Sequence, residues 1–245
     1  MTPYARRPTA PYARSVLHQV SAEAGLGFCH AVLPELLQVG YHGPLVVALD
    51  SNVLIDFQTH GSEMLNDEIG VAEAKYAEEL RCLATLLDLW MLRDIRFVVT
   101  PRARSDAKRS IPGFDEMIDG LAKSLAFQFG DWTYPAPSNR PAPPPVGDEH
   151  GLPLGADRDL VLEAQAAGAH TFVTRDRRVL RRTVLTGPSM RICAPSDLAE
   201  ELVTSGIGLM AGGLCEEQGC PYGNTRTPAP DIGKWGPLFA HFEDE

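Results

Sequence analysis

The feature that most constrains the fold is an unbroken apolar run, Leu45-Val46-Val47-Ala48-Leu49, which ends abruptly at Asp50. Five apolar residues have the length of a strand, and they leave no polar face for solvent. A strand buried on both faces is typical of a parallel sheet that helices cover on each side. The sequence after Gly43 therefore predicts a buried central strand.

Three more strand-length segments follow, and the intervals between them leave room for helices. They are Ile95–Val99, Thr171–Thr174 and Arg191–Cys193. Strands that alternate with helices indicate crossover connections and a parallel sheet. We therefore expect an α/β fold, a three-layer sandwich with a central parallel sheet flanked by helices.

The segments between the strands carry helical patterns. One apolar helix face is formed by Tyr76, Leu80, Leu83, Leu87 and Trp90. Residues 157–167 predict a helix closed by Gly168 as its C-terminal cap. Ser196 is expected to cap a short final helix. Further helical segments are expected from the end of the second strand to about Phe129.

Composition shifts divide the chain into three parts. Residues 1–43 form an N-terminal arm and helical extension, in which apolar residues about four apart predict two short helices over 15–39. Residues 44–204 form the α/β domain, interrupted by a proline-rich insertion at 135–147. Residues 205–245 form an acidic tail rich in glycine and proline, for which no regular structure is expected.

Length and composition fit one domain with extensions, since the chain has 245 residues of which 44% are hydrophobic. No run of about eighteen apolar residues occurs, so no membrane span is expected. The start lacks the pattern of an export signal. The five cysteines are odd in number and mostly scattered, which favours reduced thiols in a cytoplasmic protein. Whether Cys215 and Cys220 bind a metal or are ordinary thiols stays open.

The net charge of −10 is unevenly distributed. From Asp197 onward nine acidic residues face only Arg226 and Lys234, so about seven of the negative charges lie in this C-terminal segment. The remaining body is close to neutral and contains two concentrated basic stretches. The negative sum therefore does not exclude a nucleic-acid partner.

Four aspartates fall where the predicted parallel strands end or where the next helices begin. They are Asp50, Asp106, Asp157 and Asp176. Open α/β sheets place their ligand sites at this carboxyl edge. Carboxylates gathered there would repel one another unless a divalent cation neutralised them. Oxygen ligands without a histidine and cysteine cluster favour Mg²⁺ or Mn²⁺, one or two ions, over zinc.

A structural alternative applies to each of these aspartates. An aspartate after a strand is often only a helix N-cap or a turn residue. For Asp50 this alternative is weakest, because a carboxylate that directly follows a buried strand is costly without a partner.

Basic residues flank two of the aspartates. They are Arg102, Arg104, Lys108 and Arg109 around Asp106, and Arg175, Arg177, Arg178, Arg181 and Arg182 around Asp176. A charge run is usually a solvated face, but arginine also suits phosphate because its planar fork donates two hydrogen bonds at once. These residues are candidate RNA contacts.

The order of these motifs resembles the PIN-domain nucleases. The segment from Leu49 to Asp56, LDSNVLID, is similar to the opening motif of that family. Val99-Thr100-Pro101 with the acid Asp106 resembles its second motif, in which glutamate is more usual. Asp157 resembles the acid of its third motif, and Thr174-Arg175-Asp176 resembles its fourth. The resemblance covers about residues 45–203.

This resemblance implies a PIN-like three-layer sandwich and a metal-dependent endoribonuclease. The four aspartates would be catalytic and would bind Mg²⁺ or Mn²⁺. Supporting hydrogen bonds would come from Ser51, Asn52 and Thr174, and Asp159 ranks second to Asp157 on the same helix. The implied partners are RNA and, as in toxin-type members, a cognate antitoxin or other protein inhibitor, or a second copy of the chain.

Two other readings stay open. A phosphatase with an aspartate nucleophile would need a second aspartate where Asn52 stands. A catalytically inactive PIN module, which binds RNA or protein without cutting, is the main alternative to an enzyme.

Overall fold

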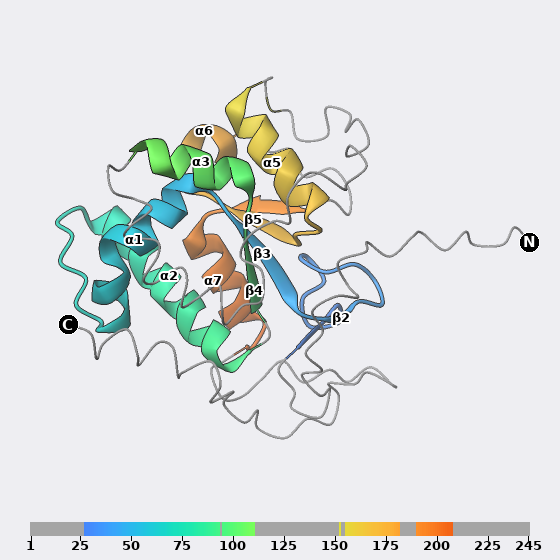
Figure 1. Cartoon of the computed structure of the whole chain (residues 1–245). Helices are drawn as coiled ribbons and strands as arrows, with labels where there is room; N and C mark the ends of the chain where they lie inside the picture. The colour runs from blue at the N-terminus through green and yellow to red at the C-terminus, as the bar shows by residue number, and fades with distance from the viewer. Residues whose placement is uncertain (1–26, 94, 111–151, 153–154, 182–189, 208–245) are drawn as a thin grey trace, which may run out of the picture.

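The computed structural model describes residues 27–93, 95–110, 152, 155–181 and 190–207. Its centre is a four-stranded sheet of β3 (Leu45–Leu49), β4 (Ile95–Val99), β5 (Thr171–Val173) and β6 (Arg191–Cys193). Every neighbouring pair is parallel, in the order β4-β3-β5-β6 (Figure 1). The four predicted strands and the parallel sheet are confirmed, with β5 one residue shorter than expected.

The register of the sheet aligns the ends of its strands. Leu49 lies opposite Val99 on one side and opposite Val173 on the other, and Val173 lies opposite Cys193. The residue after each strand therefore reaches the same carboxyl edge. The chain leaves β3 for β4 on one side and returns to β5 on the other. The strand order thus reverses at β3, and open α/β sheets bind ligands at such a reversal point.

Helices flank the sheet and cover its apolar faces. The helices are α1 (Ser51–Leu65), α2 (Ala74–Leu92), α3 (Pro101–Ser110), α5 (Ala156–Ala166), α6 (Arg177–Leu180) and α7 (Pro195–Thr204). Helix α2 packs against α1 and α7, whereas α3 packs against α1 and α5. Their apolar faces and the strands form one buried core, in which Trp90 and Phe172 are among the largest enclosed side chains. Among the described residues, no helix has the length and apolar character to cross a membrane.

The prediction of helices over residues 15–39 is wrong for the part that the structure describes. Phe28–Cys29 (β1) instead pairs antiparallel with His42–Gly43 (β2). Between them the backbone forms turns, in which the amide of Leu33 donates to Cys29 and that of Leu37 donates to Leu33. These turns place buried leucines four residues apart without forming a continuous helix. The spacing of the apolar residues therefore matches that of a helix although none is present. Residues 15–26 lie outside the described residues.

The ends of two helices test the predicted caps. Gly168 follows α5 with a φ of 76°, the left-handed conformation of a glycine that ends a helix, as expected. The last helix, in contrast, starts at Pro195 and not after Ser196. Ser196 donates both its amide and its hydroxyl to Glu79 of α2, at 3.0 and 2.9 Å, so its side chain ties α7 to α2.

Other predictions fall outside the described residues. These are the helical segments after Ser110, the proline-rich insertion at 135–147 and the tail beyond Ile207.

His170 completes the sheet at the start of β5. Its amide donates to the carbonyl of Val46 at 2.8 Å, and its Nδ1 accepts from the amide of Val46 at 3.0 Å. The ring also meets Tyr41 edge-on at 4.6 Å between centroids. Burial lowers the pKa of His170 to about 4, and the Nδ1 that accepts a hydrogen bond must stay unprotonated.

We therefore expect the free energy of unfolding to fall between pH 6.5 and 4 because of His170. In this interval His170 is protonated in the unfolded chain but stays neutral in the folded chain. Acid therefore favours unfolding. The gap between the two pKa values corresponds to roughly 3 kcal/mol. Urea unfolding should compare the wild type with His170→Asn, whose amide oxygen can still accept from Val46. The wild type should lose its advantage over this variant on acidification, and parallel pH profiles would contradict the assignment.

Candidate functional site

Asp50 follows β3 directly and caps α1, and the residue is only 5% exposed. Donors surround both of its oxygens. Oδ1 accepts from the amide of Ser51 at 2.6 Å and from its hydroxyl at 3.2 Å, and Oδ2 accepts from Asn52 Nδ2 at 2.6 Å and from Thr174 Oγ1 at 2.5 Å. The β3 strand thus ends in a carboxylate that folding has removed from water and surrounded with hydrogen-bond donors.

Thr174 joins this carboxylate to the neighbouring strand. Its buried hydroxyl donates to Asp50 and accepts from the amide of Asp176 at 2.9 Å and from Asn52 Nδ2 at 3.2 Å. The amide of Asp50 also donates to the carbonyl of Val173 at 3.0 Å. The Thr174 side chain therefore links the ends of β3 and β5, where the strand order reverses.

Asn52 adds a link from α1 to the segment after β5. Its Nδ2 reaches Asp50 and Thr174, whereas its Oδ1 accepts from the amide of Arg175 at 3.0 Å. An asparagine can do this because its amide group has both donors and an acceptor. The predicted supporting residues Ser51, Asn52 and Thr174 all lie in this network.

Two opposing effects act on the charge of Asp50. Burial raises its pKa, and the hydrogen bonds from Thr174, Ser51 and Asn52 lower it. A carboxylate has about four acceptor positions, and here four donors address them. The contact with the Ser51 hydroxyl is the longest, and this hydroxyl can rotate away. The position of the Ser51 hydroxyl is therefore the place where Asp50 Oδ1 could accept from, or bind, another partner.

Asp176 lies close to this network but is engaged by an arginine. Its Oδ1 accepts from the amide of Arg178 at 2.8 Å and caps α6, and its Oδ2 accepts from the Arg178 Nη2 at 2.8 Å. These bonds lower the pKa of Asp176. The Arg178 side chain is 81% exposed, so solvent screens this pair and it is readily exchanged.

Asp106 lies on α3 in a similar pair. Its Oδ2 accepts from Arg102 Nε at 3.0 Å, one helical turn away. The amide of Arg102 donates in turn to Glu163 of α5 at 3.0 Å. Glu163 was not among the predicted site residues, although its carboxylate contacts the start of α3. The only available signal was its acidic character within the predicted helix, because its contact depends on how α3 packs against α5.

Asp157 and Asp159 lie in the first turn of α5, where their negative charge suits the positive end of the helix. Asp157 is half-buried, whereas Asp159 is exposed. The hydrogen bond with Asp176 raises the pKa of Arg178, and the charge of Asp157 adds to this effect. The ranking of Asp157 before Asp159 stays a prediction.

The four aspartates thus differ in how closely the structure brings them together. Asp50 and Asp176 share Thr174 as a common hydrogen-bond partner. Asp106 and Asp157 are carried by α3 and α5, which pack together. Within the described parts of the chain, no three acidic, histidine or cysteine side chains are close enough to hold a metal ion.

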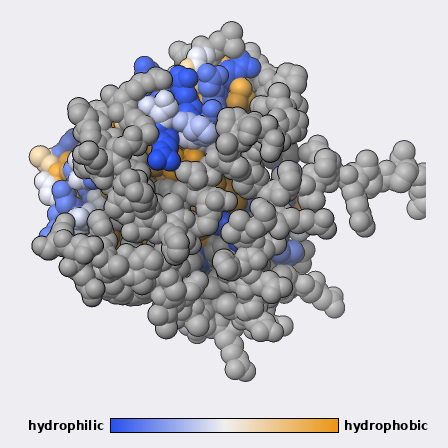
Figure 2. Space-filling view, viewed as in Figure 1, coloured by the Kyte–Doolittle hydropathy of each residue, from blue (hydrophilic) through white to orange (hydrophobic). Residues whose placement is uncertain are grey.

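The predicted basic contacts separate into different groups. Arg102 and Arg178 pair with the nearby acids, and Arg175 pairs with the buried Asp56. Arg177 and Arg181 are exposed at α6, and Arg104 is half-buried. Lys108 and Arg109 belong to α3, while Arg182 lies outside the described residues. Hydrophilic residues gather in the upper part of Figure 2, where Figure 1 places α3, α5 and α6.

Comparison of the chain with models of protein families, with curated proteins and with solved structures gives no match.

The network predicts that the Thr174 hydroxyl matters more than its methyl group. Thr174→Val keeps the shape but removes one of the four donors to Asp50 and the acceptor of the Asp176 amide, which should cost about 1–3 kcal/mol. Thr174→Ser retains the hydroxyl and serves as the control. Urea unfolding should show Thr174→Val to be the less stable variant. The gap should widen as the pH rises, because the variant loses a donor to the ionised form of Asp50 and its pKa rises further. Equal stability of the two variants would show that the hydroxyl has no such role.

Proposed function

We propose that the chain is a metal-dependent PIN-type endoribonuclease, which hydrolyses phosphodiester bonds of single-stranded or structured RNA. One observation carries the proposal. A buried aspartate, Asp50, accepts from Thr174 at the reversal point of a parallel sheet, and the same hydroxyl accepts from the backbone amide of a second aspartate, Asp176. This is the place at which an open α/β fold exposes reactive groups to a ligand. The sequence resemblance to the PIN family supports the same function.

The donor chemistry of the site fits Mg²⁺ or Mn²⁺. The candidate ligands are Asp50, Asp106, Asp157 and Asp176, whose carboxylate oxygens suit hard cations. No three of these side chains are gathered in the described structure, so binding of an ion would have to draw them together. Asp50 could turn one oxygen to an ion when the Ser51 hydroxyl rotates away, and Asp176 could do so when it releases the exposed Arg178. A bound ion would activate water and stabilise charge on the phosphate that is attacked.

The chain's own residues would prepare the site in two ways. Thr174 and Asn52 fix the carboxylate of Asp50, so that little reorganisation is needed when the substrate binds. The exposed Arg177 and Arg181 place positive charge beside Asp176, where RNA phosphates would be attracted.

The ion pairs favour a second candidate function. Asp106 and Asp176 each have an arginine partner within the chain, and these partners partly neutralise the acids without a metal ion. This arrangement is compatible with an inactive PIN module that binds RNA or protein. The two functions differ in whether RNA is cut.

The first test is cleavage of a mixed single-stranded RNA in the presence of Mg²⁺ or Mn²⁺. Asp50→Asn should reduce cleavage at least 100-fold while the chain stays folded, because an amide cannot supply the negative oxygen. Asp88→Asn, on the exposed side of α2, is the matched control and should cleave normally. EDTA should stop the reaction, and Mg²⁺ or Mn²⁺ should restore it without zinc.

Full activity of purified Asp50→Asn would remove Asp50 from the mechanism, and turnover in excess chelator would exclude the metal-dependent reaction. RNA binding without any cleavage by the wild type would favour the inactive module.

A second test concerns the arginines of α6. We expect Arg177→Glu with Arg181→Glu to weaken RNA binding, measured with Ca²⁺ on the Asp50→Asn background. Loss of two phosphate contacts should shallow the slope of log affinity against log salt by about 1.4. Lys75→Glu with Arg81→Glu makes the same charge change on α2 and should have little effect on that slope. An unchanged slope in the α6 variant would identify these arginines as a solvated surface.

A further inference from the structure

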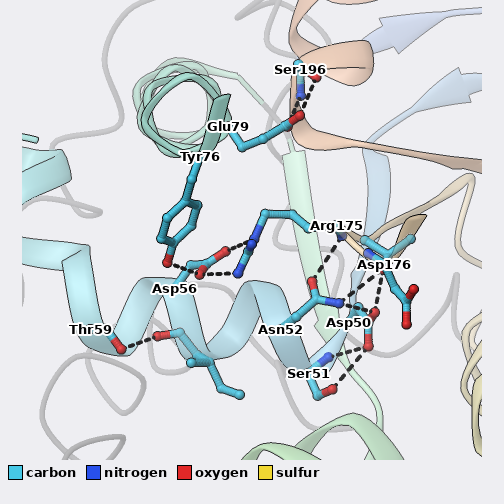
Figure 3. Close-up of polar contacts among 12 residues, drawn as sticks. Asp50, Ser51, Asn52, Asp56, Thr59, Tyr76, Glu79, Arg175, Asp176 and Ser196 are labelled. Carbon is cyan, nitrogen blue, oxygen red and sulfur yellow. Dashed lines mark hydrogen bonds and ion pairs between the residues drawn. The ribbon is translucent and has the colours of Figure 1, made fainter. Parts of the chain in front are cut away.

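A buried ion pair lies beside the candidate site and has no role in the proposed chemistry. Asp56 of α1 is fully buried, and both of its oxygens accept from Arg175, Oδ2 from Nε and Oδ1 from Nη2 at 2.6 Å. Tyr76 of α2 donates its hydroxyl to Asp56 Oδ1 at 2.7 Å. The Arg175 guanidinium also lies 4.5 Å from the centroid of the Tyr76 ring. Three elements of the fold, α1, α2 and the segment after β5, meet in this cluster (Figure 3).

This cluster fixes Arg175 at two points along one helix. Asn52 and Asp56 are four residues apart on α1, so their side chains lie on the same side of the helix. Asn52 holds the backbone amide of Arg175 at 3.0 Å, and Asp56 holds its guanidinium. The segment Thr174-Arg175-Asp176 is therefore attached along one face of α1.

The neighbours of Arg175 are the two residues that complete the candidate site. Thr174 donates to Asp50, and the amide of Asp176 donates to Thr174. A shift of Arg175 would move both of them relative to Asp50, because they are its direct neighbours in the chain. Burial of Asp56 makes such a shift costly, since a buried carboxylate that loses its partner is strongly destabilised.

The geometry also opposes a direct contact of Arg175 with RNA. Its side chain is only 26% exposed, and its Nε and Nη2 are both used by Asp56. One face of the guanidinium is turned to Tyr76. The arginine counted among the candidate RNA contacts in the sequence is thus held inside the protein.

We propose that Arg175 is a positioning residue, which aligns Thr174 and Asp176 with Asp50 through its attachment to Asp56 and Tyr76. The role rests on the proposed nuclease function, but the attachment itself can be measured without activity. Arg175 acts on the geometry of the site and does not bind phosphate.

The experiment uses the full chain with two variants of different severity. Asp56→Asn removes the charge that holds the guanidinium, and Tyr76→Phe removes only one hydrogen bond and keeps the ring. Glu201→Gln is the control, because Glu201 of α7 pairs with Arg191 of β6, an arginine as exposed as Arg175, although Glu201 itself is less buried than Asp56. Hydrogen exchange of single amides, kcat, KM and the salt dependence of RNA binding are measured for each.

We expect the amides of Arg175 and Asp176 to exchange at least 10-fold faster in Asp56→Asn and a few-fold faster in Tyr76→Phe. The amide of Asp50, which is bonded to Val173, should change little, and the control should leave all three unchanged. The value of kcat should fall at least 10-fold in Asp56→Asn, while KM and the salt slope stay near those of the wild type.

Three results would overturn the proposal. Unchanged exchange at Arg175 and Asp176 in both variants would show that the pair does not hold the segment. A raised KM with a shallower salt slope and an unchanged kcat would show that Arg175 binds RNA. Equal acceleration of exchange at all three amides in Tyr76→Phe would indicate general loosening of the fold. If the wild type cuts no RNA, the nuclease function fails, and the exchange rates alone decide whether Arg175 holds the segment.

Discussion

The hydrogen bond from Thr174 to Asp50 joins the two strands between which the sheet reverses its order. It is made by two buried groups, and its loss would leave Asp50 with only the bonds from Ser51 and Asn52 in a region of low dielectric constant. The start of α1 and the segment after β5 depend on it, because Asn52 and the amide of Asp176 bind to the same pair. The carboxyl edge of the sheet is therefore organised by polar contacts, while apolar packing holds the rest of the sheet.

The first two turns of α1 connect this edge to the α-helical layer. Asn52 is near Asp50, and Asp56 is one turn further from it, where Tyr76 of α2 closes the contact. The two residues differ in charge and in burial. Asn52 is neutral and half-buried, whereas Asp56 is a buried charge that requires both Arg175 and Tyr76. A change in α2 can thus reach the segment after β5 through side-chain contacts alone.

Much of the sheet could be predicted from the sequence, because its strands are short apolar runs with clear ends. The position of Asp50 followed from the same local pattern. The turns over 27–39 could not be predicted, since leucines four apart satisfy a helix and a series of packed turns equally well. The partner of Arg175 is 119 residues away in the chain, so no local pattern distinguished a buried ion pair from a basic surface.

The arginines near the acids show why a basic run in a sequence does not by itself identify a phosphate-binding surface. Arg102 is four residues before Asp106, and Arg178 is two residues after Asp176, spacings at which side chains of a helix or its cap can meet. Such ion pairs are only weakly stabilising when exposed. A cation that binds the acid more strongly can therefore displace the arginine, and an anion that binds the arginine more strongly can displace the acid. A divalent cation would compete with Arg178 for the carboxylate of Asp176, and a phosphate would compete with that carboxylate for Arg178. Under the proposed function the two exchanges would favour each other, because an acid that binds a cation would free its arginine for the anion.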